Sequence, residues 1–224
     1  MMAAQDTQNQ SRSMGHVALH YANPTEGPLA AKLLKLLGLV ETQELQLEGG
    51  NFYRFVVDPR HQARGDGIIY LSASPPAQRN LIQAIRDALR VGKDDQHPTV
   101  TAMRDAIAAD PEYTFHVGIL MDSLEALEEI VLDLRQRAET DPDFKGRLQV
   151  TLNRARLGDA DVDARLDASP IYGDAERYAY GRNGVQAFIE TDILTSGPLG
   201  ESLVIELDYV FPDRANHILS VVEQ

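Results

Sequence analysis

Short stretches of apolar and alternating residues in the first third of the chain predict four strands and one helix. The strand patterns stop at Asn-Pro, Gly-Gly-Asn and Pro-Pro sequences, which are typical turn signals. Pro28 suits the first position of a helix, and Gly38 suits the residue just after its end. The predicted order is one strand, one helix and three strands, at 16–21, 28–37, 42–48, 52–57 and 67–73.

The same order of patterns returns in the second half of the chain. Asp122 and Ser123 mark the start of a helix, with Glu125 placed as in a capping box. Strands are predicted at 114–121, 147–152, 184–193 and 202–210, and two helical patterns at 77–92 and 98–109 separate the halves. We therefore expect an α+β fold of two βαβββ modules.

The expected organisation has four parts. They are a disordered tail at 1–13, a first module at 14–76, a helical insert at 77–112 and a second module at 113–224. The second module carries an insertion of uncertain structure near 153–183. Two roles remain open for the insert, which either covers the site or forms a contact in a homodimer.

Composition narrows the classes of function. The 224 residues include 21 basic and 34 acidic side chains, a formal net charge of −13. This charge argues against binding to nucleic acid or to an anionic membrane surface. The absence of cysteine excludes disulfides and thiol nucleophiles. No apolar run approaches the roughly 18 residues of a membrane span. We expect a cytoplasmic protein.

Histidines and one glutamate lie where a metal site could form. Side chains alternate along a strand, so His16 and His20 share a small-residue face of their strand. His116 opens the equivalent strand of the second half in the same way. Glu206 interrupts an apolar strand, and a buried carboxylate needs a partner or a metal. Two imidazoles and a carboxylate form the set that holds Fe(II) or Mn(II) with open coordination positions.

His16 and His20 cannot both bind one metal. Four residues of strand separate them by about 13 Å at a rise of ~3.3 Å per residue. We take His16, His116 and Glu206 as the candidate ligands, and His20 as a candidate pocket base. The alternative is that each histidine is a rim residue and that Glu206 simply faces water.

Three segments resemble the vicinal-oxygen-chelate superfamily, which includes glyoxalase I, bleomycin-resistance proteins and type I extradiol dioxygenases. They are HVALHYANP before AKLLKLLGL, HVGILMD before SLEALEEIVLDL, and SLVIEL near the end of the chain. The resemblance implies that the modules form a curved mixed sheet, or cup, with helices on its outer face and a metal inside. It places His16, His116 and Glu206 on ligand positions.

The remaining ligand position of the resemblance falls on Tyr70, with Ser72 on the same strand face. Neither is a carboxylate, which departs from the four-ligand pattern of glyoxalase I and is closer to the extradiol dioxygenases. We expect Tyr70, Ser72, Arg54 and Phe188 to contact a substrate, although Arg54 equally suits a solvent-facing position.

The resemblance implies a ring-cleaving dioxygenase that uses Fe(II) or Mn(II) to chelate the two oxygens of a catechol-like molecule. Two alternatives remain. One is a metal-dependent isomerase, epimerase or lyase acting through an enediolate. The other is a metal-free protein that binds a small aromatic ligand. Fold alone does not decide among the three.

Overall fold

The computed structural model describes residues 13–110, 112, 114–177 and 183–213. Residues 1–12 of the predicted tail lie outside this part. Within it, the fold is α+β and is built on one curved, mixed sheet of nine strands. No helix in the described part combines the length and the apolar character needed to cross a bilayer.

The first module follows the predicted order. It contains β1 (His16–Tyr21), α1 (Gly27–Leu36), β2 (Val40–Leu45), β3 (Phe52–Val56) and β4 (Ile68–Ala73). In space the strands run β2-β3-β4-β1. The last strand pairs with the first in parallel, and the other two pairs are antiparallel.

The second module repeats this arrangement. It contains β5 (His116–Leu120), α4 (Leu124–Thr140), β6 (Leu148–Arg154), β8 (Gly184–Ser196) and β9 (Glu201–Val210). β5 pairs with β9 in parallel, while β9 pairs with β8 and β8 with β6 in antiparallel fashion. The repeated β-α-β-β-β order read from the sequence is therefore confirmed.

The two modules share one sheet and one core. β1 pairs with the far end of β8 through His20–Thr195 and Tyr21–Leu194. α1 packs against β4 and β8, and α4 packs against β6 and β9. One continuous apolar cluster joins the residues of both modules.

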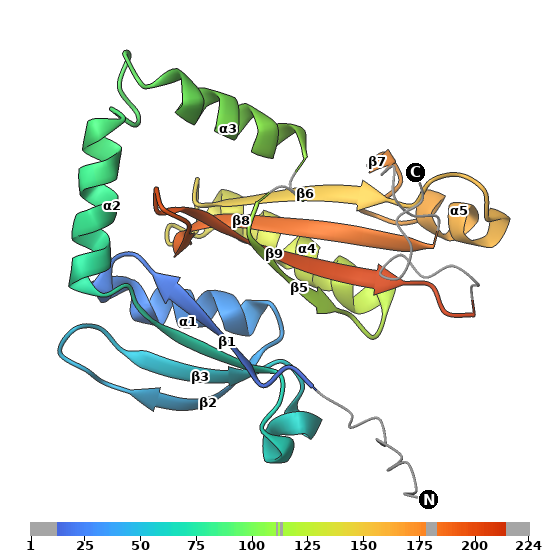
Figure 1. Cartoon of the computed structure of the whole chain (residues 1–224). Coiled ribbons are helices and arrows are strands. Elements are labelled where there is room, and N and C mark those ends of the chain that lie inside the picture. The colour runs from blue at the N-terminus through green and yellow to red at the C-terminus, as the bar shows by residue number, and fades with distance from the viewer. Residues whose placement is uncertain (1–12, 111, 113, 178–182, 214–224) are drawn as a thin grey trace, which may run out of the picture.

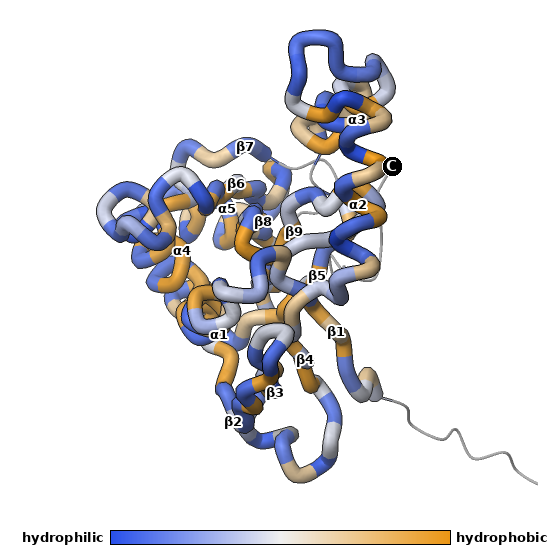
Figure 2. The backbone as a smooth tube through the Cα atoms, turned by 90° about the vertical axis from the view of Figure 1, so that its left-hand side faces the viewer, coloured by the Kyte–Doolittle hydropathy of each residue, from blue (hydrophilic) through white to orange (hydrophobic). Residues whose placement is uncertain are grey.

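The insert between the modules consists of α2 (Pro76–Ala88) and α3 (Pro98–Ala109). Figure 1 shows α2 standing beside the sheet and α3 lying above the strands of the second module. The loop that joins them is hydrophilic (Figure 2). The expected helix at 77–92 ends earlier, because Arg90 (φ 53°) and Gly92 (φ 78°) take left-handed conformations.

The segment of uncertain structure after β6 contains α5 (Ala160–Asp167) and the short strand β7 (Glu176–Arg177). Arg154, at the end of β6, is 2% exposed. Its guanidinium donates to the carbonyls of Tyr172 and Gly173 and to the carboxylate of Asp167. This buried cation therefore ties the end of α5 and the turn after it to the sheet.

Candidate metal centre and adjoining cavity

Strand register places titratable side chains of β5, β8 and β9 on the sheet face opposite the apolar core of the second module. Leu203, Ile205 and Leu207 of β9 are buried in the core, so Val204, Glu206 and Asp208 lie on the other face. Three rows of neighbours cross β5, β9 and β8 on that face: His116–Val204–Glu190, Gly118–Glu206–Phe188 and Leu120–Asp208–Gln186. The predicted placement of Glu206 among apolar strand residues is thus correct.

Glu112, His116 and Glu206 form a cluster that could hold a metal ion. One ligand atom from each lies within 4.8 Å of the others. His116 Nε2 is 3.2 Å from Glu206 Oε2 and 3.5 Å from Glu112 Oε2. Glu112 lies in the connection between α3 and β5. A cation between these groups would be held by the imidazole nitrogen and the facing carboxylate oxygens.

The tautomer of His116 suits metal binding. Its Nδ1 lies 2.9 Å from the carbonyl oxygen of Thr114. A carbonyl only accepts, so Nδ1 must carry the hydrogen, and Nε2 is the nitrogen with a lone pair to offer. Metal-binding histidines are commonly oriented by such a hydrogen bond from the second ring nitrogen.

Gln186 fixes the two glutamates of the cluster. Its amide nitrogen donates to Glu112 Oε1 at 2.8 Å and to Glu206 Oε1 at 2.5 Å. These bonds occupy one oxygen of each carboxylate and leave the other, Oε2, facing His116. Each carboxylate is therefore held with one oxygen available to a cation.

Asp208 adds a further carboxyl beside Glu206. Burial, followed by the neighbouring charge of Glu206, raises the pKa of Asp208 to about 8. Burial also raises the pKa of Glu206. The two side chains share a hydrogen bond, and a protonated Asp208 donates it. The Oδ1 atom of Asp208 is buried without a hydrogen-bond partner in the described part of the chain.

Gly118 leaves space over this acidic pair. A Cβ atom at this position would lie 3.4 Å from Asp208 Oδ2 and 3.6 Å from Glu206 Oε2. Together with the orphaned Oδ1, this space fits a bound divalent cation. One imidazole nitrogen and carboxylate oxygens suit first-row divalent ions, among them the expected Fe(II) and Mn(II).

The structure brings two of the three expected ligands together. His116 and Glu206 adjoin, whereas His16 is not a member of the cluster found among the described residues. The exposed His16 ring lies instead against Tyr70 of the first module, with centroids 5.0 Å apart. Coordination by His16 stays a prediction. Glu112 was missed because it lies outside the helices and strands that the sequence pattern predicted.

The other expected site residues lie in the first module, except Phe188. Ser72 Oγ is 3.3 Å from His20 Nδ1. The Arg54 guanidinium donates to Thr42 Oγ1 at 2.7 Å. A base role for His20 and substrate contacts for Arg54, Tyr70 and Ser72 stay predictions.

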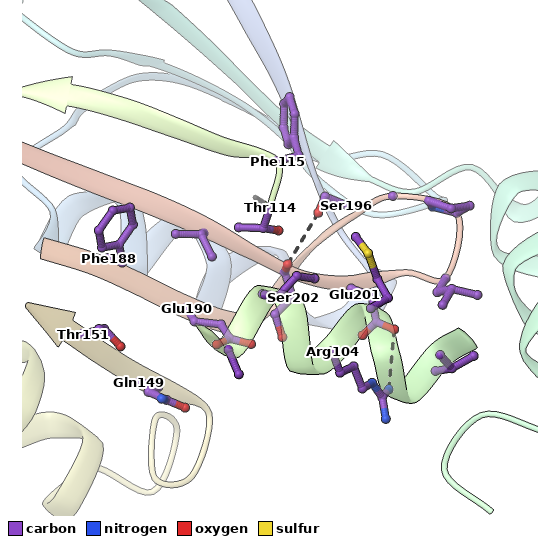
Figure 3. Close-up of a pocket in the computed structure, with 18 residues that line it drawn as sticks. Arg104, Thr114, Phe115, Gln149, Thr151, Phe188, Glu190, Ser196, Glu201 and Ser202 are labelled. Carbon is purple, nitrogen blue, oxygen red and sulfur yellow. Dashed lines mark hydrogen bonds and ion pairs between the residues drawn. The ribbon is translucent and has the colours of Figure 1, made fainter. Parts of the chain in front are cut away.

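A cavity of about 660 Å³ lies between α3 and the same face of the second module's sheet (Figure 3). Its apolar lining comes from Val100, Met103 and Ile107 of α3, from Phe115, and from Phe188 and Val204 of the sheet. Glu190 and Gln149 add polar atoms. This volume suits a small organic molecule, and α3 is its roof.

Phe188 joins the cavity to the cluster. Its ring is 2% exposed and lines the cavity. The ring also meets the imidazole of His116 edge to face, with centroids 6.4 Å apart. Phe188 is therefore shared between the cavity wall and the surroundings of His116.

Comparison with known proteins gives no match to a protein-family model and none to a curated protein. Similar solved structures include the following two. One is described as a possible glyoxalase from Bacillus cereus. It is 15% identical, with a TM-score of 0.35, and the match covers 88% of this chain and 98% of the Bacillus cereus chain. The other is described as a glyoxalase/bleomycin resistance protein/dioxygenase family enzyme from Burkholderia phytofirmans PsJN. It is 12% identical, with a TM-score of 0.38, and the match covers 89% of this chain and 100% of the Burkholderia chain.

These identities and TM-scores assign neither a family nor an activity. The strand order and register define the class: an α+β protein of two βαβββ modules, with a Glu–His–Glu cluster beside a roofed cavity.

Proposed function

We propose that this chain is a metal-dependent enzyme acting on a small molecule with two adjacent oxygens. The observation that carries the proposal is the convergence of Glu112, His116 and Glu206 within 4.8 Å, next to a cavity of about 660 Å³. A divalent ion held by these residues would supply Lewis-acid polarisation of the bound oxygens.

The residues around the cluster favour proton transfer over ring cleavage. The cluster has one imidazole and two carboxylates, not the two imidazoles expected for a dioxygenase. Asp208 keeps a proton near neutral pH, because its pKa is about 8, and it donates a hydrogen bond to Glu206. Glu190 places a further carboxylate in the cavity wall, where it could accept a proton from a ligand. Such a set suits the isomerase, epimerase or lyase alternative.

Metal retention tests the proposal and separates the two possible ligand sets. We expect the purified chain to bind Mn(II) or Fe(II) stoichiometrically by elemental analysis. Glu112→Gln, His116→Ala and Glu206→Gln should each lose the metal, while His16→Ala should keep it. Loss of metal in His16→Ala, with retention in Glu112→Gln, would restore the ligand set expected from the sequence.

Oxygen consumption tests the reaction class. The Fe(II)-loaded chain should take up no oxygen above background when catechol is added under air. Catechol-dependent uptake that disappears in His116→Ala would contradict proton transfer and support ring cleavage.

One observation favours metal-free ligand binding as a second candidate. Gln186 already donates a hydrogen bond to each of the two glutamates without a cation, and the cavity needs no metal to hold an apolar molecule. A chain that gains no metal from millimolar Mn(II), Fe(II) or Zn(II), yet binds aromatic ligands, would establish this function instead.

A further inference from the structure

We infer that a second, smaller cavity beside the first is a binding site for an oxyanion, carboxylate or phosphate. The ligand would be a small organic anion whose apolar body occupies the larger cavity. This inference does not depend on the metal centre, because it rests on different residues.

The second cavity has a volume of about 410 Å³ and lies where α2 meets the ends of β8 and β9. It shares Arg104, Leu199, Glu201 and Ser202 with the larger cavity. The two spaces are therefore neighbours with a common wall, and one molecule could extend from one into the other.

Positive charge gathers in this cavity, although the chain carries a net charge of −13. Arg79 and Arg86 of α2 and Arg104 of α3 line it. Arg104 is paired with Glu201 at 3.5 Å (Figure 3). The lining carboxylate of Asp192 is paired at 2.7 Å with Arg147, which also binds Glu26.

Arg79 and Arg86 are left without a carboxylate partner in the described part of the chain. Each donates one hydrogen bond to a backbone carbonyl: Arg79 to that of Ser74 and Arg86 to that of Leu199. A guanidinium has five N–H donors in a planar fork that matches the oxygens of carboxylates and phosphates. Most of these donors therefore remain for a ligand.

Ser74 provides independent support for a ligand at this place. It lines the same cavity and is 1% exposed. Its Oγ is buried without a hydrogen-bond partner among the described residues. Because an unpaired buried hydroxyl is costly, a group that accepts a hydrogen bond from it would stabilise the site.

Isothermal titration of the full-length, chelator-treated chain tests the inference. The probes are 4-phenylbutyrate, its uncharged analogue 4-phenylbutanol, and phenyl phosphate. We expect one or both anions to bind more tightly than the alcohol, and the stronger anion tells carboxylate from phosphate. Equal affinity for all three probes, or no binding of either anion, would overturn the inference.

Variants locate the binding. Arg79→Gln and Arg86→Gln should each weaken anion binding by about tenfold or more, since charged hydrogen bonds are lost, without changing the affinity for the alcohol. Ser74→Ala should weaken anion binding by about two- to tenfold without lowering the melting temperature. Lys145→Gln, which removes one exposed charge outside both cavities, is the matched control.

If Arg79 and Arg86 only hold α2 in place, their substitution lowers the melting temperature and reduces binding of the anions and the alcohol alike. Because the titrations are made without metal, their outcome is separate from the metal-retention experiment.

Discussion

Gly118 decides how much room lies over the two buried carboxyls of β9. Its position on β5 faces Glu206 in the register, and a Cβ there would come into contact with both acidic side chains. Glycine lowers the stability of a strand interior, so its presence is explained by the space it leaves. The same small-residue face was visible in the sequence beside His116.

Gly118→Val should therefore fold but bind metal poorly. The backbone at this position does not need a positive φ, and valine favours strands. Its methyl groups would enter the space beside Glu206 Oε2, so we expect Mn(II) affinity to fall by about tenfold or more, or ~1.4 kcal/mol. Titration with Mn(II) followed by paramagnetic relaxation measures it. Gly15→Ala, which meets nothing within 4 Å, is the control, and unchanged affinity in Gly118→Val would exclude this site.

Asp208 should make the metal-free fold less stable as pH rises. The carboxyl has a pKa of about 8 in the fold against an ordinary 3.8, so the folded state binds the proton more tightly than the unfolded chain. Its stabilising contribution is complete below the unfolded pKa and is lost as pH rises through about 8.

Urea midpoints of the chelator-treated chain should consequently fall between about pH 4 and pH 8. Asp208→Asn keeps a donor toward Glu206 and removes the titration, so its midpoint should depend less on pH. Parallel profiles for the two proteins would mean that Asp208 is ionised in the fold.

At the scale of elements, one buried side chain makes a large polar contribution to holding the segment after β6, beside the contacts of Glu128 with Arg165 and Ser169. Arg154 reaches α5 and the turn that follows it. An apolar side chain at this position could not donate hydrogen bonds to the carbonyls of Tyr172 and Gly173. The sequence left this segment undefined, because its hydrophobic pattern is weak and its stabilising contacts are polar and distant along the chain.

Arg154→Ala should remove the hydrogen bonds to the Tyr172 and Gly173 carbonyls and the ion pair with Asp167, and should destabilise the chain by about 2–4 kcal/mol. Residues 160–177 should lose protection from hydrogen exchange before the rest of the sheet does. Arg135→Ala on the exposed side of α4 should change stability by less than about 0.5 kcal/mol. Equal effects of the two substitutions would argue that the segment is held by its apolar contacts.

The order of elements could be read from the sequence better than their ends. Alternation and turn residues predicted each major strand, including β2, which has no buried residue. The continuation of β8 to Ser196 was missed, because a register shift between Thr191 and Thr195 breaks the alternation there. The end of α2 was missed for a similar reason, since Arg90 takes a left-handed conformation.

At the scale of the whole molecule, the candidate site was only half predictable. Strand alternation gave the shared face of His116 and Glu206, which belong to one module. Equivalence within a repeat does not fix the distance between modules, which depends on the pairing of β1 with β8, and so it could not place His16. Glu112 lies outside the helices and strands predicted from the sequence, so periodicity gave no face on which to place it. The homodimer stays a prediction.

The common core predicts that both modules unfold together. Tyr21 and Leu194, paired where β1 meets β8, are fully buried. We expect a single calorimetric transition. Leu194→Ala should lower the free energy of unfolding by about 2–5 kcal/mol, and the transition should remain single. Two separated transitions in the parent chain would contradict a shared core, and Leu81→Ala on the exposed face of α2 is the control.

The hydrophilic loop between α2 and α3 divides the chain at a favourable place. A single cleavage there would leave an N-terminal fragment with one entire βαβββ unit. The C-terminal fragment would retain the other unit, the covering helix and the Glu–His–Glu group. Because α3 stays with the strands it covers, the halves are candidates for expression as two polypeptides that reassociate, as in a split-reporter assay.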